Sequence, residues 1–244
     1  MRVLVVGGTR FIGRRTVQEL LDRGHEVTIF HRGKSPNPFG GRVAEVLGDR
    51  LDPTSVSRAL AGRRFDAVVD IAYDWNARTG AREVSFVVDA LGGLTERYAY
   101  LSSMSVYALG PLPTTEEAPR APMLGSYSED KIGAEDYLMA MHREGRVGVS
   151  IIRPPFVYGP WNDLPRETWF WDRILADRPV LVPDDGGTRF QWVAARDVAW
   201  ALAESLENPK AAGEAFNIAE ETPVTHAEFI DRLAAVAGRE VEKV

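Results

Sequence analysis

The stretch that decides the fold is Gly7-Gly8-Thr9-Arg10-Phe11-Ile12-Gly13. It follows an apolar run at 2–6, which predicts a buried strand, and it enters an amphipathic run at 11–23, which predicts a helix. Backbone N–H groups at such a helix start, together with the helix dipole, form an anion site that suits a pyrophosphate. Gly7 permits the tight turn, and Gly13 lets the helix pack closely on the strand. A strand–helix turn without a ligand is the alternative, and this context favours the pyrophosphate site.

Short apolar runs and amphipathic runs alternate along the first part of the chain. Strands are predicted at 2–6, 26–31, 43–47, 66–71, 98–102 and 149–153, and helices at 11–23, 53–60, 78–91 and 127–143. Asp52 and Pro53 suit the cap and the first position of the second helix. The alternation implies a parallel sheet covered on both faces. We therefore predict an α/β fold, a Rossmann-type doubly wound parallel sheet, with residues 1–158 as the dinucleotide-binding domain.

The pattern after residue 158 is less regular and predicts a small substrate lobe at 159–244. Helices are predicted at 169–176, 196–207 and 226–236, and short strands at 180–182, 189–193 and 215–218. The elements at about 189–218 are expected to return to the Rossmann sheet.

Composition narrows the class of protein. The chain has 244 residues, of which 45% are hydrophobic and 26% charged, so it is long enough for a sizeable core. It lacks cysteine, which excludes disulfides and thiolate chemistry, and its four histidines are scattered, so we expect no metal site. The net charge of −6 argues against nucleic-acid binding. Because no apolar run approaches the ~20 residues of a membrane span and no targeting segment is evident, we expect a cytoplasmic protein.

Charges near the second strand favour NADP over NAD. An acidic residue about 20 residues after the glycines usually binds the ribose 2′-hydroxyl, and here that place follows Phe30 and holds His31 and Arg32. Arg10 replaces the middle glycine, so its side chain must point away from the loop. Arg10, Arg32 and Lys34 would suit a 2′-phosphate, because guanidinium groups pair with phosphate. The alternative is that Arg32 and Lys34 are solvated loop charges.

Three side chains suggest a catalytic set. Tyr127 and Lys131 lie four residues apart and share one helix face. Lowering the pKa of a phenol from near 10 to about 7 needs roughly 4 kcal/mol, which we expect the Lys131 ammonium and an oxidised nicotinamide to supply. Tyr127 would then exchange a proton with the substrate. Ser103, at the end of the fifth strand, would bind the reacting oxygen; turn capping is the alternative.

Together these motifs resemble the short-chain dehydrogenase/reductase superfamily, in its extended NAD(P)-dependent epimerase/dehydratase branch. The resemblance runs from residue 7 to about residue 238. It rests on the glycine loop, Ser102 to Tyr107, the Tyr127/Lys131 pair, Arg153-Pro154-Pro155-Phe156-Val157-Tyr158-Gly159-Pro160, Arg196-Asp197-Val198-Ala199 and Phe216-Asn217-Ile218. It implies that Ser103 is the catalytic hydroxyl and that residues 154–157 lie beside the nicotinamide.

Several positions depart from the family pattern. Dehydratases carry an Asp-Glu pair after the catalytic hydroxyl, where this chain has Met104 and Ser105, so we do not expect a sugar dehydratase. Phe156 replaces the Asn that contacts nucleotide-sugars in many epimerases, and Phe190 stands where an arginine binds their diphosphate. The loop and the residues 31–34 look most like an atypical subgroup that includes the chloroplast stem-loop-binding proteins. We therefore expect a substrate other than a nucleotide-sugar.

The predicted cofactor site combines the glycine loop with the ends of the following strands. Asp49 would accept from the adenine amino group, with turn formation as the alternative. The predicted cofactor-binding residues are Gly7, Thr9, Arg10, Phe11, Ile12, Gly13, His31, Arg32, Lys34, Asp49, Arg50, Ile71, Ala72, Ser102, Pro154, Phe156 and Val157.

The functional hypothesis is an NAD(P)-dependent oxidoreductase or epimerase that acts on a small hydroxyl or carbonyl compound. An RNA-binding protein or an NADP-sensing regulator that reuses the fold is the alternative. The expected partner is a small-molecule substrate, without membrane or nucleic acid, and the sequence allows a homodimer. Family members usually continue well past the helix at 226–236, so we expect the substrate lobe to be incomplete.

Overall fold

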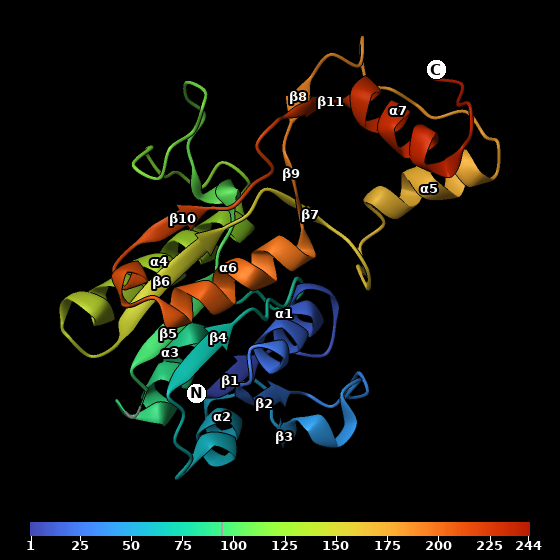
Figure 1. The fold of residues 1–244 in the computed structure, drawn as a ribbon. Helices are drawn as coiled ribbons and strands as arrows, with labels where there is room; N and C mark the ends of the chain where they lie inside the picture. The colour runs from blue at the N-terminus through green and yellow to red at the C-terminus, as the bar shows by residue number, and fades with distance from the viewer. Residues whose placement is uncertain (94) are drawn as a thin grey trace.

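The computed structural model describes residues 1–93 and 95–244 and is built on a seven-stranded sheet. Its strands are β1 (Arg2–Val6), β2 (Glu26–His31), β3 (Ala44–Leu47), β4 (Ala67–Asp70), β5 (Arg97–Leu101), β6 (Gly148–Arg153) and β10 (Ala215–Asn217). Their order is β3-β2-β1-β4-β5-β6-β10, and every neighbouring pair runs parallel (Figure 1). This order reverses beside β1 and confirms the doubly wound prediction.

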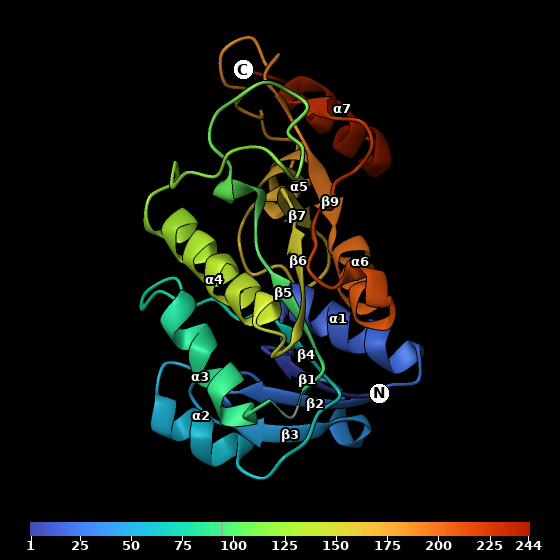
Figure 2. The ribbon, with the colours of Figure 1, turned by 90° about the vertical axis from the view of Figure 1, so that its left-hand side faces the viewer.

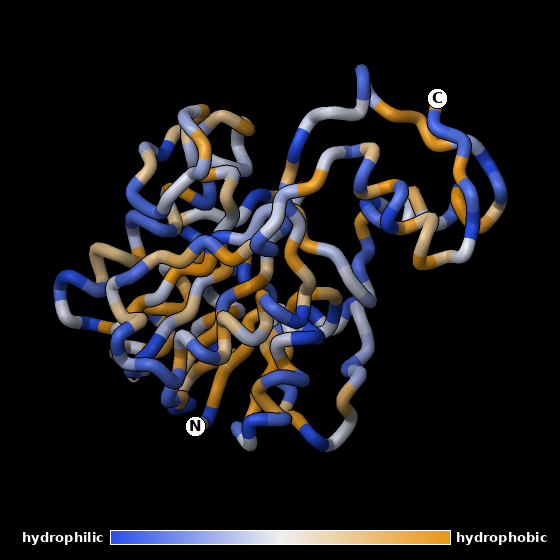
Figure 3. The backbone as a smooth tube through the Cα atoms, turned by 45° about the horizontal axis from the view of Figure 1, so that its top comes forward, coloured by the Kyte–Doolittle hydropathy of each residue, from blue (hydrophilic) through white to orange (hydrophobic). Residues whose placement is uncertain are grey.

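Helices cover both faces of the sheet, as Figure 2 shows. One face carries α1 (Phe11–Asp22) and α6 (Ala195–Glu207), and the other carries α2 (Pro53–Leu60), α3 (Ala81–Leu91) and α4 (Ser126–Arg143). Alternate side chains of β1 belong to the hydrophobic cores on the two faces of the sheet. Val3 and Val5 pack beneath α1 and α6, whereas Leu4 and Val6 pack against α2, α3 and α4. A central parallel strand buried on both faces must be apolar throughout, which Figure 3 makes visible as hydrophobic colour along the inner strands.

The C-terminal lobe stands beyond one end of the sheet, at the upper right of Figure 1. Its elements are β7 (Phe156–Tyr158), α5 (Glu167–Leu175), β8 (Arg189–Phe190), β9 (Trp192–Ala194), β11 (Val224–Thr225) and α7 (His226–Ala237). Short 3-10 turns lie elsewhere in the described chain: η1 (Gly40–Arg42), η2 (Met104–Val106) and η3 (Pro209–Ala211). β7 pairs with β9, and β8 pairs with β11. Helices α5 and α7 enclose a small core of Ile174, Val180, Ile230 and Ala234.

Most predicted elements are confirmed, and four details differ. The helix predicted from residue 78 begins at Ala81, because Arg78 has a φ of +64°. The strand predicted at 180–182 is wrong, since Val180 forms only an isolated bridge to Lys243. The strand predicted at 189–193 is split between β8 and β9, which pair outside the main sheet, whereas α6 and β10 do return to it. Strands β7 and β11 were not predicted because they are only two or three residues long.

Two further findings concern the expected caps and spans. Asp52 caps α2, accepting from the Thr54 N–H with Pro53 at the first helical position, as predicted. Across residues 1–93 and 95–244, every helix is too short or too polar to traverse a lipid bilayer.

Candidate active site

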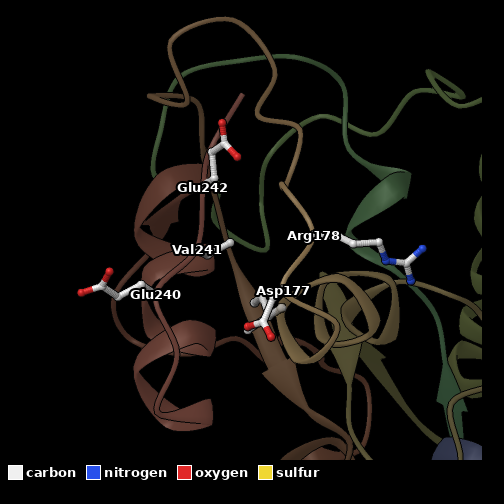
Figure 4. Close-up of a pocket in the computed structure, with 6 residues that line it drawn as sticks. Asp177, Arg178, Glu240, Val241 and Glu242 are labelled. Carbon is white, nitrogen blue, oxygen red and sulfur yellow. The ribbon is translucent and has the colours of Figure 1, made fainter.

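A cleft of about 1350 Å³ runs along the carboxyl edge of the sheet, from the glycine loop to the C-terminal lobe. Every predicted cofactor-binding and catalytic residue lines it. Most of these residues follow the carboxyl ends of β1 to β6, which the parallel sheet gathers at one edge, whereas Tyr127 and Lys131 come from α4 and Phe156 and Val157 from β7. A smaller cavity of about 400 Å³ in the C-terminal lobe is bordered by Asp177, Glu240 and Glu242 and holds none of the predicted site residues (Figure 4).

The glycine loop has the backbone that a diphosphate site requires. Gly7 has a φ of +93°, which favours glycine, and a Cβ on it would lie 2.8 Å from the Cβ of Ala72. A Cβ on Gly13 would lie 1.9 Å from the carbonyl oxygen of Gly7, so only glycine fits there. Arg10 makes no side-chain capping bond, which leaves the first N–H groups of α1 for an anion. This chain therefore fits a dinucleotide diphosphate at residues 7–13.

Two of the three cations expected at a ribose phosphate are paired with carboxylates. Arg32 donates to Asp74 at 2.8 Å, and Arg10 lies 2.5 Å from Asp163, which follows β7. The Arg10 pairing directs that side chain toward the substrate lobe. The Asp74 carboxylate also accepts from the N–H groups of Ala77 and Asn76, and these bonds hold its pKa below the usual range.

The next two predicted residues are held by the protein itself. Asp49 accepts from the N–H of Leu51, so the turn-forming alternative is observed, although the side chain also lines the cleft. Arg50 is buried and binds both carboxylate oxygens of Asp70, at 2.5 and 3.0 Å. Asp70 also accepts from the Tyr98 hydroxyl at 2.6 Å. The charge of Arg50 is thus neutralised beneath the cleft floor, and only part of its side chain faces the cofactor site.

Lys131 lies on the inner face of α4, where its side chain is only 3% exposed. Its ammonium donates to the carbonyl of Leu101 at 2.7 Å and to the Tyr100 hydroxyl at 3.3 Å. Burial lowers the pKa of Lys131 to about 8, although the nearby Asp70 carboxylate acts in the opposite direction. This ammonium is therefore more easily deprotonated than an ordinary lysine.

Tyr127 differs from expectation in its ionisation. Burial raises its pKa above the usual value of a phenol, and the opposing effects of the Ser103 hydroxyl and the Arg166 charge do not outweigh it. The expected lowering of this pKa requires the Lys131 ammonium together with a bound oxidised nicotinamide; in the chain alone the Lys131 ammonium lies 5.9 Å from the centre of the Tyr127 ring and donates to the Leu101 carbonyl. The phenol is consequently protonated at neutral pH.

Aromatic side chains enclose Tyr127, a feature that the sequence analysis missed. The ring of Trp75 stacks on it at 4.8 Å, and the ring of Tyr73 meets it edge-on at 4.9 Å. The Tyr73 hydroxyl donates to Asp130, which also accepts from Arg78. The available signal was the pair of aromatic residues directly after β4, at the edge where ligands bind.

The two serines after β5 have different environments. The Ser103 hydroxyl accepts from the N–H of Ser105 and so caps η2, which is the alternative role considered for it. The same hydroxyl hydrogen-bonds to the Tyr127 phenol, which favours a lower pKa of that phenol. The Ser102 hydroxyl is buried and has no hydrogen-bond partner among the described residues. An unpaired polar atom lining a cleft suits a bound ligand. Ser128 ties α4 to this turn by donating to the Ser105 carbonyl at 2.8 Å.

A buried ion-pair network fixes α4, which carries Tyr127 and Lys131. Glu135 is 0% exposed and accepts from Arg153 on β6 at 2.6 and 2.9 Å. Arg120, from the loop before α4, donates to the same carboxylate at 2.9 Å. Because Glu135 of α4 is bonded both to β6 and to the loop before the helix, this network fixes the position of α4 on the sheet.

The far end of the cleft is lined by the C-terminal lobe and the loop before α4. It presents mostly apolar side chains with a few charged ones: Met104, Leu112, Leu124, Phe156, Arg166, Arg189, Phe190 and Glu221. Within residues 1–93 and 95–244, no group of three or more His, Asp or Glu side chains is arranged to hold a metal ion. This end of the cleft thus combines a mostly apolar wall with a few charged side chains.

Comparison with known proteins gives one matching family model and many relatives. The model described as "NAD dependent epimerase/dehydratase family" matches residues 3–219. The chloroplast stem-loop binding protein of 41 kDa b from Arabidopsis thaliana is 37% identical over 92% of this chain and 60% of its own length. The 2′-dehydrokanamycin reductase of Streptomyces kanamyceticus is 31% identical over 98% of this chain and 67% of its own length. This chain thus spans about 60% of the length of its plant relative.

Solved structures share the whole fold. The UDP-glucose 4-epimerase of Thermus thermophilus, solved in complex with NAD, superposes with a TM-score of 0.84. The match is 25% identical and covers 100% of this chain and 86% of that chain. The likeness therefore includes both the sheet and the C-terminal lobe.

Proposed function

This chain belongs to the NAD dependent epimerase/dehydratase family, and we propose that it is a nicotinamide-dependent reductase of a small carbonyl compound. The observation that carries the proposal is the meeting of Ser103, Tyr127 and Lys131 in the cleft that begins at the glycine loop. A bound nicotinamide supplies or accepts the hydride. The residues of this chain bind and orient the substrate, and they transfer the proton.

Tyr127 is the proposed proton donor. A phenol is protonated at neutral pH, and burial raises the pKa of Tyr127 further, so this hydroxyl can give a proton to a carbonyl oxygen as the carbonyl carbon is reduced. The Ser103 hydroxyl, which acts on the phenol, would donate to the same oxygen. Trp75 and Tyr73 enclose the Tyr127 ring and limit the access of water to it. The same groups in reverse would oxidise an alcohol.

Reduction is preferred to the other reactions of the family on two grounds. Met104 and Ser105 follow the catalytic hydroxyl and cannot serve as the acid and base of a dehydratase. The Streptomyces relative is named as a reductase, which supports single hydride transfer over epimerisation. The net charge of −6 argues against nucleic-acid binding as the function of this chain, although the Arabidopsis relative is named as a stem-loop binding protein.

The test of this role is Tyr127→Phe, with Tyr137→Phe as the matched control on the same helix outside the cleft. We expect Tyr127→Phe to lower kcat for carbonyl reduction by about a hundredfold or more, because the proton donor is lost while the ring remains. Cofactor affinity, measured by fluorescence titration, should change little in either variant. Equal kcat in Tyr127→Phe and the parent protein would end the assignment. An NADP sensor without turnover predicts instead that the parent protein reduces no carbonyl substrate.

The proposed cofactor is NADP rather than NAD. β2 ends in His31 rather than in a carboxylate, Arg32 keeps 37% of its side chain exposed beside Asp74, and Lys34 lines the same part of the cleft. The Arg32 guanidinium would bind a ribose phosphate by exchanging Asp74 for it, whereas a carboxylate at the end of β2 itself would repel one. Arg10 would contribute only if it left Asp163.

Arg32→Gln tests this preference. We expect the Kd for NADPH to rise about tenfold and the Kd for NADH to stay near its parent value, because only NADPH has the phosphate that Arg32 binds. Arg42→Gln, an exposed arginine outside the cleft, is the control. A parent protein that binds NADH more tightly than NADPH would refute the preference without touching the reductase proposal.

A further inference from the structure

Arg166 is a cation at the substrate end of the cleft, where the described part of the chain gives it no carboxylate partner. Arg10 and Arg32, which line the same cleft, are both paired with acidic side chains. Among residues 1–93 and 95–244, no acidic group forms an ion pair with the Arg166 guanidinium. Arg189, the other arginine at that end, acts on Glu228 of α7. Arg166 is therefore the cation best placed to receive an anion from outside the chain.

The position of Arg166 is next to the reaction centre. Its guanidinium carbon lies 5.8 Å from the centre of the Phe156 ring, and Phe156 lines the cleft with 49% of its surface exposed. The charge of Arg166 also acts on the Tyr127 hydroxyl and favours the phenolate, a second indication that the two groups face one cavity. A negative group bound to Arg166 would thus lie within one small molecule's length of the proton donor.

The segment that carries Arg166 is held in place. Glu167, the next residue, is buried and accepts from the N–H of Gly159 and from the side-chain amide of Asn162, both at 2.9 Å. These bonds close the turn between β7 and α5 without using the Arg166 side chain. These bonds fix the backbone beside Arg166, and the contact of its guanidinium with the Phe156 ring reduces the freedom that the side chain would lose on binding a ligand.

The wall of the cleft around Arg166 is mostly apolar, although the charged Arg189 and Glu221 also line this end. Met104, Leu112, Leu124 and Phe190 line this end of the cleft, and Trp75 lies over Tyr127 with 59% of its surface exposed. Such a wall favours a hydrocarbon or aromatic body over a sugar, and one planar guanidinium suits one planar carboxylate.

We propose that the substrate is an apolar carbonyl compound that bears a carboxylate, and that Arg166 binds this carboxylate and orients the carbonyl toward Tyr127. The proposal rests on the reductase function above and adds the chemical class of the substrate. It makes Arg166 a specificity-determining residue of this chain.

The test compares matched ligands by equilibrium binding in the presence of NADP⁺, so that it does not depend on turnover. One series is aromatic, 4-acetylbenzoate against its methyl ester; the other is alkyl, 3-oxooctanoate against its methyl ester. Binding is followed by calorimetry in the parent protein, in Arg166→Met and Arg166→Lys, and in Arg178→Met as a control in the C-terminal lobe. A third ligand, 4-acetylphenyl phosphate, distinguishes carboxylate recognition from general anion binding.

We expect the parent to bind the acid about tenfold more tightly than the ester in at least one series, because only the acid can pair with the guanidinium. Arg166→Met should remove this preference while leaving ester affinity near the parent value, and Arg166→Lys should retain part of it. Equal affinity for acid and ester in both series, tighter binding of the phosphate than of the acid, or a preference that survives Arg166→Met would overturn the proposal. So would a Kd for NADPH that rises in Arg166→Met, since the arginine would then serve the cofactor.

The two proposals fail separately. Tyr127→Phe should keep the acid–ester preference in binding even though it loses reduction. If the preference is present but Tyr127→Phe reduces carbonyls as fast as the parent, the reductase mechanism fails and the anion site stands.

Discussion

Replacing Lys131 by Met should change how the stability of the folded protein depends on pH. The ammonium is 3% exposed, and burial lowers its pKa to about 8 from the 10.5 of an unperturbed lysine. Below the folded-state value both the folded and the unfolded chain carry the proton, so this group adds no pH dependence. Between the two values the unfolded chain binds a proton that the folded chain has released. The parent protein therefore gains stability as pH rises through this window.

The magnitude follows from the two pKa values. Each unit of difference corresponds to about 1.4 kcal/mol, and between about pH 7 and pH 9.5 the gain amounts to about 2 kcal/mol of unfolding free energy. In a chain of this size that corresponds to about 4–8 °C in Tm. Met has a similar length and no charge, so Lys131→Met lacks this gain. At pH 7 the variant also escapes the cost of a buried ammonium, partly offset by the lost bond to the Leu101 carbonyl.

The assay is urea unfolding of the parent and the variant, followed by circular dichroism at several pH values in this range. Only the difference between the two proteins is interpreted, because all other titrating groups are shared. The parent should gain about 2 kcal/mol on the variant as the pH rises. A difference that stays constant, or that moves in the variant's favour, would mean that the Lys131 ammonium is solvated in the folded protein. The inferred environment of the catalytic set would then be wrong.

Two further substitutions test the cofactor loop and the anchor of α4. Gly13→Ala places a methyl group against the carbonyl of Gly7, so we expect a loss of about 3 kcal/mol in stability and much weaker NADPH binding. Gly41→Ala is the control, because there is open space around that residue. Equal behaviour of the two variants would contradict the packing argument. Glu135→Gln leaves Arg153 buried without its counter-charge and should cost about 3 kcal/mol in urea unfolding, with a Tm lower by about 6–12 °C, whereas an unchanged Tm would show that the network does not hold α4.

The parts of this site that could be predicted are those encoded within a short stretch of chain. The turn at Gly7 and Gly13 depends on backbone geometry over seven residues, and the shared face of Tyr127 and Lys131 depends only on helical spacing. The alternation of apolar and amphipathic runs determined the sheet as well, because parallel strands need crossover helices. These features follow from local covalent and steric rules.

The parts that could not be predicted depend on which strand ends become neighbours. Arg32 meets Asp74 because β2 and β4 both pair with β1, although the two residues are 42 positions apart. Tyr73 and Trp75 enclose Tyr127 for a similar reason, since the loop after β4 lies beside the start of α4. The two missed strands, β7 and β11, form only because the fold brings them beside their pairing partners, β9 and β8.

Sequence alone therefore determined the fold class, the glycine-rich loop and which side chains we propose as catalytic. Only the tertiary structure decided the ionisation of the side chains in the cleft. Burial raises the pKa of Tyr127 and lowers that of Lys131. Carboxylates far away in the sequence pair with the arginines Arg10, Arg32 and Arg50. The physical reason is that backbone conformation is set by neighbours along the chain. The charge on a side chain is set by how much water and which opposite charges the packed fold leaves around it.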